Sequence, residues 1–149
     1  RLLCEQGAGS IYLFGTAGEG YAVDREQYLQ IVTEFMDEMK NYPDVIPMVG
    51  VISMSMTEIK ERIRLAGELG VRYFQISFPN WGAVSDSEAL DFFRSVCGDF
   101  PDYSFMHYNN AYNCNPAYIC DEILRQKLPW ELVYVSDKKK EFNLSLIIL

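Results

Sequence analysis

Residues 10–40, SIYLFGTAGEGYAVDREQYLQIVTEFMDEMK, contain the repeating unit that decides the fold class. A short apolar strand is predicted over Ser10–Phe14, and it leads into a glycine-rich turn. A helix is predicted from about Asp24 to Lys40, because apolar side chains recur there at the spacing of one helical face. These side chains are Tyr28, Ile31, Val32, Phe35 and Met39. The stretch is therefore one strand–turn–helix unit.

The same unit recurs along the rest of the chain. Further strands are predicted over residues 45–52, 71–78, 103–108 and 132–135, with helices between them, the last a short one at about 115–126. Capping-box patterns at Ser55-x-x-Glu58 and Ser85-x-x-Glu88 predict two of the helix starts. Strict alternation of apolar strands with helices predicts an α/β fold with a parallel sheet covered by helices. It does not distinguish a barrel from an open doubly wound sheet of the flavodoxin type.

The composition is that of one globular core and disfavours several kinds of partner. The chain has 149 residues, of which 49% are hydrophobic, and a net charge of −8. This charge argues against nucleic-acid binding, because phosphates are neutralised by clustered Lys and Arg, and we interpret the one basic run, 138–140, as a solvated turn. No apolar stretch predicts a membrane span and no signal peptide is recognisable, so we expect a cytoplasmic protein that does not bind membranes.

No metal ion or cofactor is expected. The four cysteines lack C-x-x-C spacing and the chain has a single histidine, which favours reduced thiols over a zinc site or a disulfide framework.

The two ends of the chain suggest a larger domain. Residues 1–6 resemble the last turns of a helix, and the apolar segment 144–149 has nothing after it to pack against. We therefore expect residues 1–149 to be a partial domain, truncated at both ends.

Functional groups in a parallel α/β fold gather where the strands end. After the first strand, the closely spaced glycines of Gly15–Gly20 allow backbone N–H groups to converge on a small anion, although a plain tight turn would use the same glycines. His107 and Tyr108 are adjacent on a predicted strand, so their side chains point to opposite faces. We expect His107 to pack against the helices and Tyr108 to face inward, as a proton relay or as a core tyrosine.

Four of these segments together resemble a known family. Gly15-Thr16-Ala17-Gly18-Glu19 is similar to a G-T-T-G-E loop, Ala66–Val71 to an A-x-x-x-G-A/V helix end, Phe78–Trp81 to a P-Y-Y segment, and Tyr108-Asn109 to a Y-N-x-P motif. In this combination they resemble the dihydrodipicolinate synthase / N-acetylneuraminate lyase family over nearly the whole chain. The resemblance implies a (β/α)8 barrel, of which the chain would hold about strands two to six.

The resemblance also implies an activity, that of a Schiff-base aldolase. In this family a lysine at the end of the sixth barrel strand forms a Schiff base with pyruvate or another 2-keto acid. By resemblance, the backbone of Gly15, Thr16, Ala17 and Gly18 would hold the substrate carboxylate, Thr16 would join a proton relay, and Tyr108 would shuttle protons. The partner would be a small-molecule 2-keto acid, and the protein a homo-oligomer, a tetramer in the family.

Several positions depart from the family pattern. Ala17 replaces a threonine, Trp81 stands where dihydrodipicolinate synthases have a tyrosine, and Asn113 stands where they have an arginine. These departures argue against dihydrodipicolinate synthase proper and leave a relative acting on another aldol substrate, such as a sugar-derived keto acid.

The position of the lysine is the largest departure. Counting from Tyr108 without gaps puts Ser136 at the Schiff-base position, and Lys138 follows two residues later on the same side of a strand. Three readings stay open: Lys138 is the Schiff-base lysine, the reading frame is shifted from about Leu128, or the protein is a catalytically inactive barrel that binds a 2-keto or sugar acid.

Overall fold

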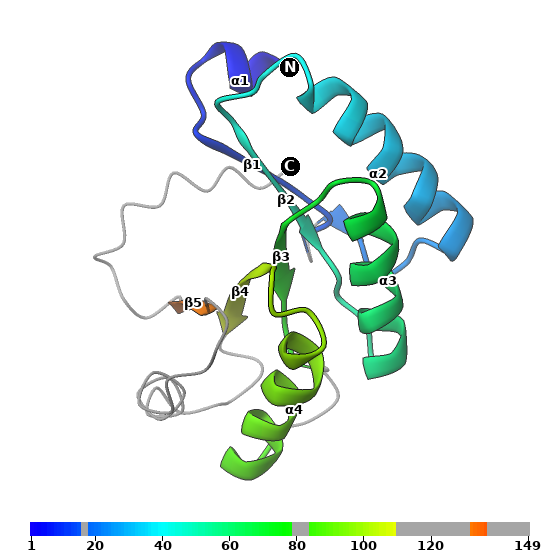
Figure 1. Ribbon diagram of the computed structural model, residues 1–149, viewed down its shortest axis with the longest axis vertical. Helices are drawn as coiled ribbons and strands as arrows, with labels where there is room; N and C mark the ends of the chain where they lie inside the picture. The colour runs from blue at the N-terminus through cyan, green and yellow to red at the C-terminus, as the bar shows by residue number, and fades with distance from the viewer. Residues whose placement is uncertain (16–17, 79–83, 110–131, 137–149) are drawn as a thin grey trace.

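The described part of the chain is a parallel sheet covered by helices (Figure 1). The computed structural model describes residues 1–15, 18–78, 84–109 and 132–136. In chain order the elements are α1 (Leu2–Glu5), β1 (Ser10–Leu13), α2 (Arg25–Met39), β2 (Ile46–Gly50), α3 (Met56–Glu68), β3 (Tyr73–Ile76), α4 (Asp86–Gly98), β4 (Ser104–Asn109) and β5 (Leu132–Ser136). They confirm the predicted strands and long helices, whereas the helix predicted at 115–126 lies outside the described residues. None of the described helices is long and apolar enough to cross a membrane.

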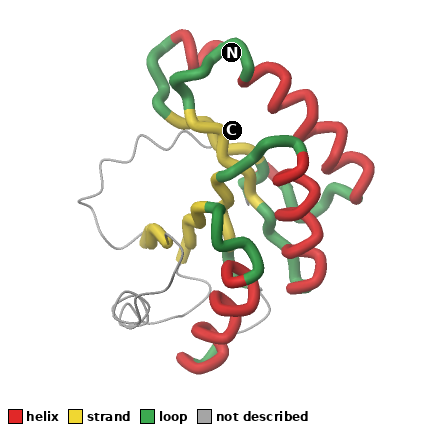
Figure 2. The backbone as a smooth tube through the Cα atoms, in the orientation of Figure 1, coloured by secondary structure: helices red, strands yellow, loops and turns green. Residues whose placement is uncertain are grey.

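The order of the strands identifies the sheet as part of a barrel. The order is β1-β2-β3-β4-β5, and each strand pairs in parallel with the next one along the chain. A doubly wound sheet reverses its order at a switch point, and the described strands contain no reversal. Right-handed connections that advance in one direction put all helices on one face, and Figure 2 shows the long helices on one side of the strands. The described strands are therefore part of a (β/α)8 barrel, and a doubly wound sheet is ruled out for them.

Side-chain caps begin helices α2 and α4, as the sequence predicted for α4. The Asp24 carboxylate accepts a hydrogen bond from the N–H of Gln27 at 2.9 Å, and the Gln27 side chain accepts one from the N–H of Asp24 at 3.0 Å. Ser85 and Glu88 form the same reciprocal pair before α4. Each cap satisfies N–H groups that the first helical turn leaves without a partner.

The start of α3 departs from the expected capping box. The Ser55 hydroxyl accepts a hydrogen bond from the N–H of Glu58 at 3.4 Å, which is half of the box. The Ser55 N–H donates instead to the Ser53 hydroxyl at 3.2 Å, and the Glu58 carboxylate pairs with the Arg62 guanidinium at 2.9 Å. The predicted helix start at Ser55 is confirmed, and the sequence pattern does not reveal the partners that replace the second half of the box.

The hydrophobic core lies between the sheet and the helices. Apolar side chains of β2, β3 and β4 meet those of α2, α3 and α4, and full burial of each contributes about 2 kcal/mol. Fully buried members of this core include Tyr28, Val32, Val49, Ile59, Ile63, Phe74, Ile76, Phe93, Val96 and Phe105. The helical face predicted for α2 is confirmed, since Tyr28, Val32 and Met39 are buried and Ile31 and Phe35 pack at the edge of the core.

His107 belongs to this core, on the side of the sheet that faces the helices, as predicted. Its ring lies 5.0 Å from that of Phe93 in α4 and 4.5 Å from that of Phe78, with edge-to-face geometry in both cases. Nδ1 lies 3.3 Å from the carbonyl oxygen of Ile76, which favours the tautomer with its proton on that nitrogen. Burial lowers the pKa of His107 to about 4, so the imidazole is neutral at pH 7.

Acidification should therefore weaken the fold through His107. Because its pKa is lower in the folded than in the unfolded chain, the unfolded chain binds more protons between pH 6.5 and pH 4. The free energy of unfolding of the complete gene product, measured by urea denaturation, should fall by about 2 kcal/mol from this group between pH 7 and pH 5. His107→Phe keeps a ring beside Phe93 and should lose this share of the pH dependence; an unchanged profile would contradict the assignment.

Candidate active site

The candidate site lies at the edge of the sheet where the strands end. There β1 leads into Phe14-Gly15, β3 into Ser77-Phe78, and β4 ends at Tyr108-Asn109. In a barrel of parallel strands these ends converge on one mouth, so groups from distant parts of the sequence can meet one ligand.

The segment after β1 folds into a tight turn based on Gly15. The N–H of Gly18 donates to the carbonyl oxygen of Gly15 at 3.0 Å, and the N–H of Gly20 approaches the same oxygen at 3.5 Å. Thr16 and Ala17, between these glycines in the sequence, lie outside the described residues. Gly15 and Gly18 thus form the base of the turn.

Phe14 enters the turn in a strained conformation. Its φ of 67° is in the left-handed region that bulky side chains rarely adopt. The ring is buried and stacks on Tyr28 of α2, with ring centroids 5.2 Å apart. Such strain costs about 1–3 kcal/mol and persists where the surroundings over-determine the conformation. Stacking on Tyr28 shows that α2 helps to hold Phe14 in this conformation.

Tyr108 is half-buried near the carboxyl end of β4. Because His107 points toward α4, strand alternation implies the opposite, inner face for the Tyr108 side chain. Its carbonyl oxygen accepts a hydrogen bond from the Ser77 hydroxyl at 3.4 Å. The role of its phenol in proton transfer stays a prediction.

The two candidates for the Schiff-base position differ in how the structure places them. Ser136 is the last residue of β5, and its backbone pairs with Asn109 of β4. Lys138 lies outside the described residues, as do Trp81 and Asn113.

A buried polar chain crosses the inner face of the sheet, and the sequence analysis missed it. The Tyr12 hydroxyl of β1 donates to Gln75 Oε1 of β3 and lies 3.2 Å from the Phe14 carbonyl oxygen. The Gln75 amide donates to the Ser77 hydroxyl at 2.7 Å, and Ser77 reaches the backbone of Tyr108. Burial raises the pKa of Tyr12, so its phenol stays a neutral donor. The signal was present in the sequence, since Gln75 and Ser77 are polar residues at alternate positions of an apolar strand.

Gly50 makes this chain possible. It lies in β2, between the strands that carry Tyr12 and Gln75, and pairs with Gln75. A Cβ atom added at Gly50 would lie 2.7 Å from the Tyr12 hydroxyl oxygen and would clash with the Phe14 carbonyl oxygen. Only glycine lets Tyr12 extend across β2.

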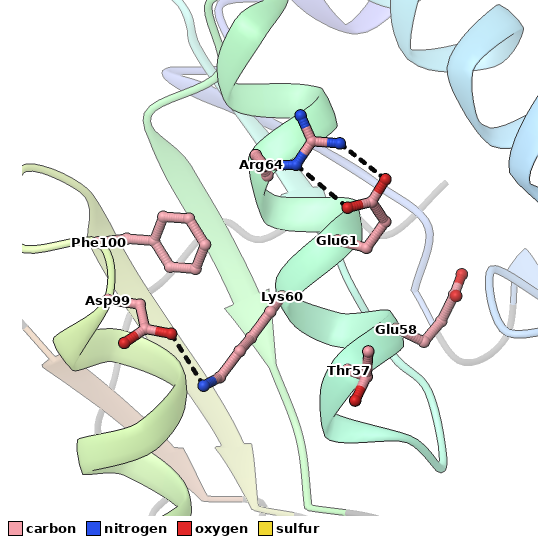
Figure 3. Close-up of a pocket in the computed structure, with 7 residues that line it drawn as sticks. All are labelled: Thr57, Glu58, Lys60, Glu61, Arg64, Asp99 and Phe100. Atoms are coloured by element: carbon pink, nitrogen blue, oxygen red, sulfur yellow. Dashed lines mark hydrogen bonds and ion pairs between the residues drawn. The ribbon is translucent and has the colours of Figure 1, made fainter.

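A surface hollow elsewhere on the chain is not part of this site. It is lined by α3 and by the residues that follow α4. Figure 3 shows Lys60 extending from α3 to pair with Asp99, with 2.8 Å between Nζ and the carboxylate. Arg64 and Glu61 pair on its rim at 2.8 Å. All the lining residues belong to α3 or follow α4, so the hollow lies on the helical face and not at the strand ends.

The fold thus defines the class: a (β/α)8-barrel protein whose ligand site is expected at the carboxyl edge of the strands. The sequence model of the "Dihydrodipicolinate synthetase family" matches residues 1–117. The chain belongs to this family, whose members are lyases and aldolases.

Individual relatives agree with the family. N-acetylneuraminate lyase of Rattus norvegicus is 28% identical over 109 residues, which cover 72% of this chain and 34% of the relative. The chain thus spans about a third of the length of the curated relatives that it matches.

Solved structures match in fold. A Ruminococcus gnavus sialic acid aldolase, a catalytic lysine mutant, has a TM-score of 0.77 at 15% identity. The match covers 92% of this chain and 45% of the aldolase chain. YagE, a prophage protein of the dihydrodipicolinic acid synthase family from E. coli K12 in complex with pyruvate, has a TM-score of 0.65 at 20% identity, over 72% of this chain and 35% of its own.

Enlarging Gly50 should disrupt the candidate site. In Gly50→Ala the added methyl must displace Tyr12 or Phe14, and overpacking of this kind costs about 1–3 kcal/mol. Urea denaturation of the complete gene product should report this loss. Gly9→Ala is the matched control, because a Cβ at Gly9 meets nothing within 4 Å and should change stability by less than about 0.5 kcal/mol. Equal stability of the two variants would refute the close approach.

Proposed function

We propose that the protein is a carbon–carbon lyase, an aldolase that forms a Schiff base between a lysine and pyruvate or another 2-keto acid. Membership of the dihydrodipicolinate synthetase family supports this proposal. The observation that carries it within the fold is that the Gly15–Gly18 turn follows the end of β1 and Tyr108 lies near the end of β4, at the same edge of the parallel sheet. The pyruvate complex of YagE and the catalytic lysine named for the sialic acid aldolase support the same chemistry.

The reaction needs a neutral amine at the centre of the barrel. The lysine nitrogen attacks the keto carbon, the carbonyl oxygen leaves as water, and an iminium forms. The iminium accepts the electron pair of a breaking carbon–carbon bond, while the adjacent substrate hydroxyl loses its proton and that fragment leaves as an aldehyde. The resulting enamine takes up a proton, and water hydrolyses the imine to release the 2-keto acid and the free lysine. We propose Lys138 as this lysine, because it follows the carboxyl end of β5. An apolar barrel interior would lower its pKa and so favour the neutral form.

The remaining groups would bind the substrate and move protons. In our proposal, the backbone N–H groups of Thr16 and Ala17 hold the substrate carboxylate, and Gly15 and Gly18 shape the turn that presents them. The hydroxyls of Thr16 and Tyr108 would relay protons between the substrate and solvent.

A sugar-derived keto acid is our proposed substrate class. The departures at Ala17, Trp81 and Asn113 argue against dihydrodipicolinate synthase proper. The similarity to N-acetylneuraminate lyase favours a sugar acid, whose extended chain would need more space at the mouth than pyruvate alone.

Assembly and location are further parts of the proposal. We infer that residues 1–149 are part of an eight-stranded barrel, since they supply five strands and match about a third of each curated relative. A homo-oligomer, a tetramer by family resemblance, is proposed. A cytoplasmic location is supported by the free thiols of Cys4 and Cys97 in the described residues.

An inactive barrel that binds a 2-keto or sugar acid is the second candidate. Ser136, which ends β5 and falls at the lysine position when residues are counted from Tyr108, favours it. A serine cannot form the iminium, so the two candidates differ in whether a covalent adduct forms.

Borohydride reduction in the presence of pyruvate separates them. The complete gene product should gain a stable adduct on Lys138, because borohydride reduces the iminium to a secondary amine; peptide mapping by mass spectrometry identifies the site. Lys138→Met should form no adduct, whereas Lys139→Met, the adjacent lysine, should react like the wild type. A folded wild-type protein without any adduct would favour the inactive barrel.

Removal of the Tyr108 hydroxyl should slow turnover more than binding. Tyr108→Phe keeps the ring, so kcat should fall by about 10²–10⁴-fold while KM changes little, as measured by steady-state kinetics with the sugar-acid substrate. Tyr103→Phe is the control, since Tyr103 lies just before the opposite end of β4. Equal kcat values for the two variants would remove Tyr108 from the mechanism.

A further inference from the structure

Arg62 of α3 is buried and links its own helix to the connection between β1 and α2. Its side chain is 5% exposed. Nη1 donates to the carbonyl oxygen of Gly20 at 2.7 Å, and Nη2 to that of Val23 at 2.8 Å. Nε pairs with Glu58 at 2.9 Å. The guanidinium thus holds the connection between β1 and α2 at two carbonyl groups, those of Gly20 and Val23, which follow the Gly15–Gly18 turn in the sequence.

The same arginine also supports the other end of the turn. Its guanidinium carbon lies 5.0 Å from the centroid of the Tyr28 ring, and that ring stacks on Phe14 at 5.2 Å. The Tyr28 hydroxyl in turn donates to the Arg62 carbonyl oxygen at 3.3 Å. Arg62, Tyr28 and Phe14 therefore form a column that ends at the strained residue before Gly15.

The two ends of the turn are in direct contact. A Cβ atom at Gly20 would lie 2.6 Å from the Cβ of Phe14 and 2.8 Å from its carbonyl oxygen. Arg62 holds Gly20 directly and Phe14 through Tyr28, so it contacts or supports the chain on both sides of the Gly15–Gly18 turn.

We propose that Arg62 is a positioning residue that sets the affinity of the Gly15–Gly18 turn for the carboxylate of the substrate. This inference rests on the proposed function, in which the turn binds that carboxylate. Arg62 does not act as a direct ligand, because its Nε, Nη1 and Nη2 all donate to partners within the protein and Glu58 neutralises its charge. Its effect is exerted through the backbone that it holds.

The test uses pyruvate and its neutral analogue pyruvamide with the complete gene product. The concentration of each that gives half-maximal borohydride adduct measures its binding. The wild type should prefer pyruvate, because only pyruvate carries a carboxylate. Arg62→Met should raise the half-maximal pyruvate concentration by roughly tenfold or more, since small misplacements of binding groups can cost up to about 10²-fold. The value for pyruvamide should change less than about threefold, which a general loss of structure would not produce.

Two further variants make the result decisive. Arg62→Lys has a single ammonium in place of the planar guanidinium and cannot bridge both carbonyls as arginine does. Its half-maximal pyruvate concentration should therefore lie between those of the wild type and Arg62→Met. Arg64→Met is the matched control: Arg64 is in the same helix but makes only exposed pairs with Glu61 and Glu68, and it should behave like the wild type.

Each outcome has a defined meaning. If Arg62→Met does not fold, Arg62→Lys carries the test. A folded Arg62 variant with wild-type preference for pyruvate over pyruvamide, or an equal loss for both ligands, overturns the positioning role and leaves the proposed function intact. A folded wild type that forms no adduct refutes the proposed function and this inference with it.

Discussion

The hydrogen bonds of the Arg62 guanidinium are the constraint on which the candidate site depends. Burying a charge costs several kcal/mol unless its donors are satisfied, and here two backbone carbonyls, a carboxylate and an aromatic face surround it. The connection between β1 and α2 makes backbone hydrogen bonds of its own, such as the one from Gly18 to Gly15, and two more of its carbonyl oxygens are held from outside. Arg62 supplies these outside bonds from α3, a helix that begins after the next strand.

The two faces of the sheet divide stability from function. The face toward the helices is packed with apolar side chains and includes a neutral histidine, His107. The inner face carries Tyr12, Gln75 and Ser77, whose burial is tolerated only because each polar group has a partner. Strand alternation separates the two sets, which explains how adjacent residues such as His107 and Tyr108 can face different surroundings.

Features with local causes could be predicted from the sequence, and features with distant causes could not. Helix α4 was predicted through its capping box, and the opposite orientations of His107 and Tyr108 follow from the strand period. By contrast, Tyr12 and Gln75 are 63 residues apart, and Arg62 and Gly20 are 42 apart, so no local pattern links them. The strand order is equally non-local: alternation of strands and helices fitted an open sheet and a barrel alike, and the family motifs favoured the barrel.

The position of Gly50 explains how two distant strand ends can act as one site. The groups proposed to meet the substrate come from β1 and β4, which are separated in the sheet by β2 and β3. Since Gly50 has no side chain, Tyr12 reaches across β2 to Gln75, and the hydrogen bonds continue through Ser77 to the backbone of Tyr108. The carbonyl group of Phe14, next to Gly15, and the backbone of Tyr108 are thereby tied to one network of buried side chains. Their spacing is set by the scaffold before any ligand binds, which reduces the entropy lost when the substrate is positioned.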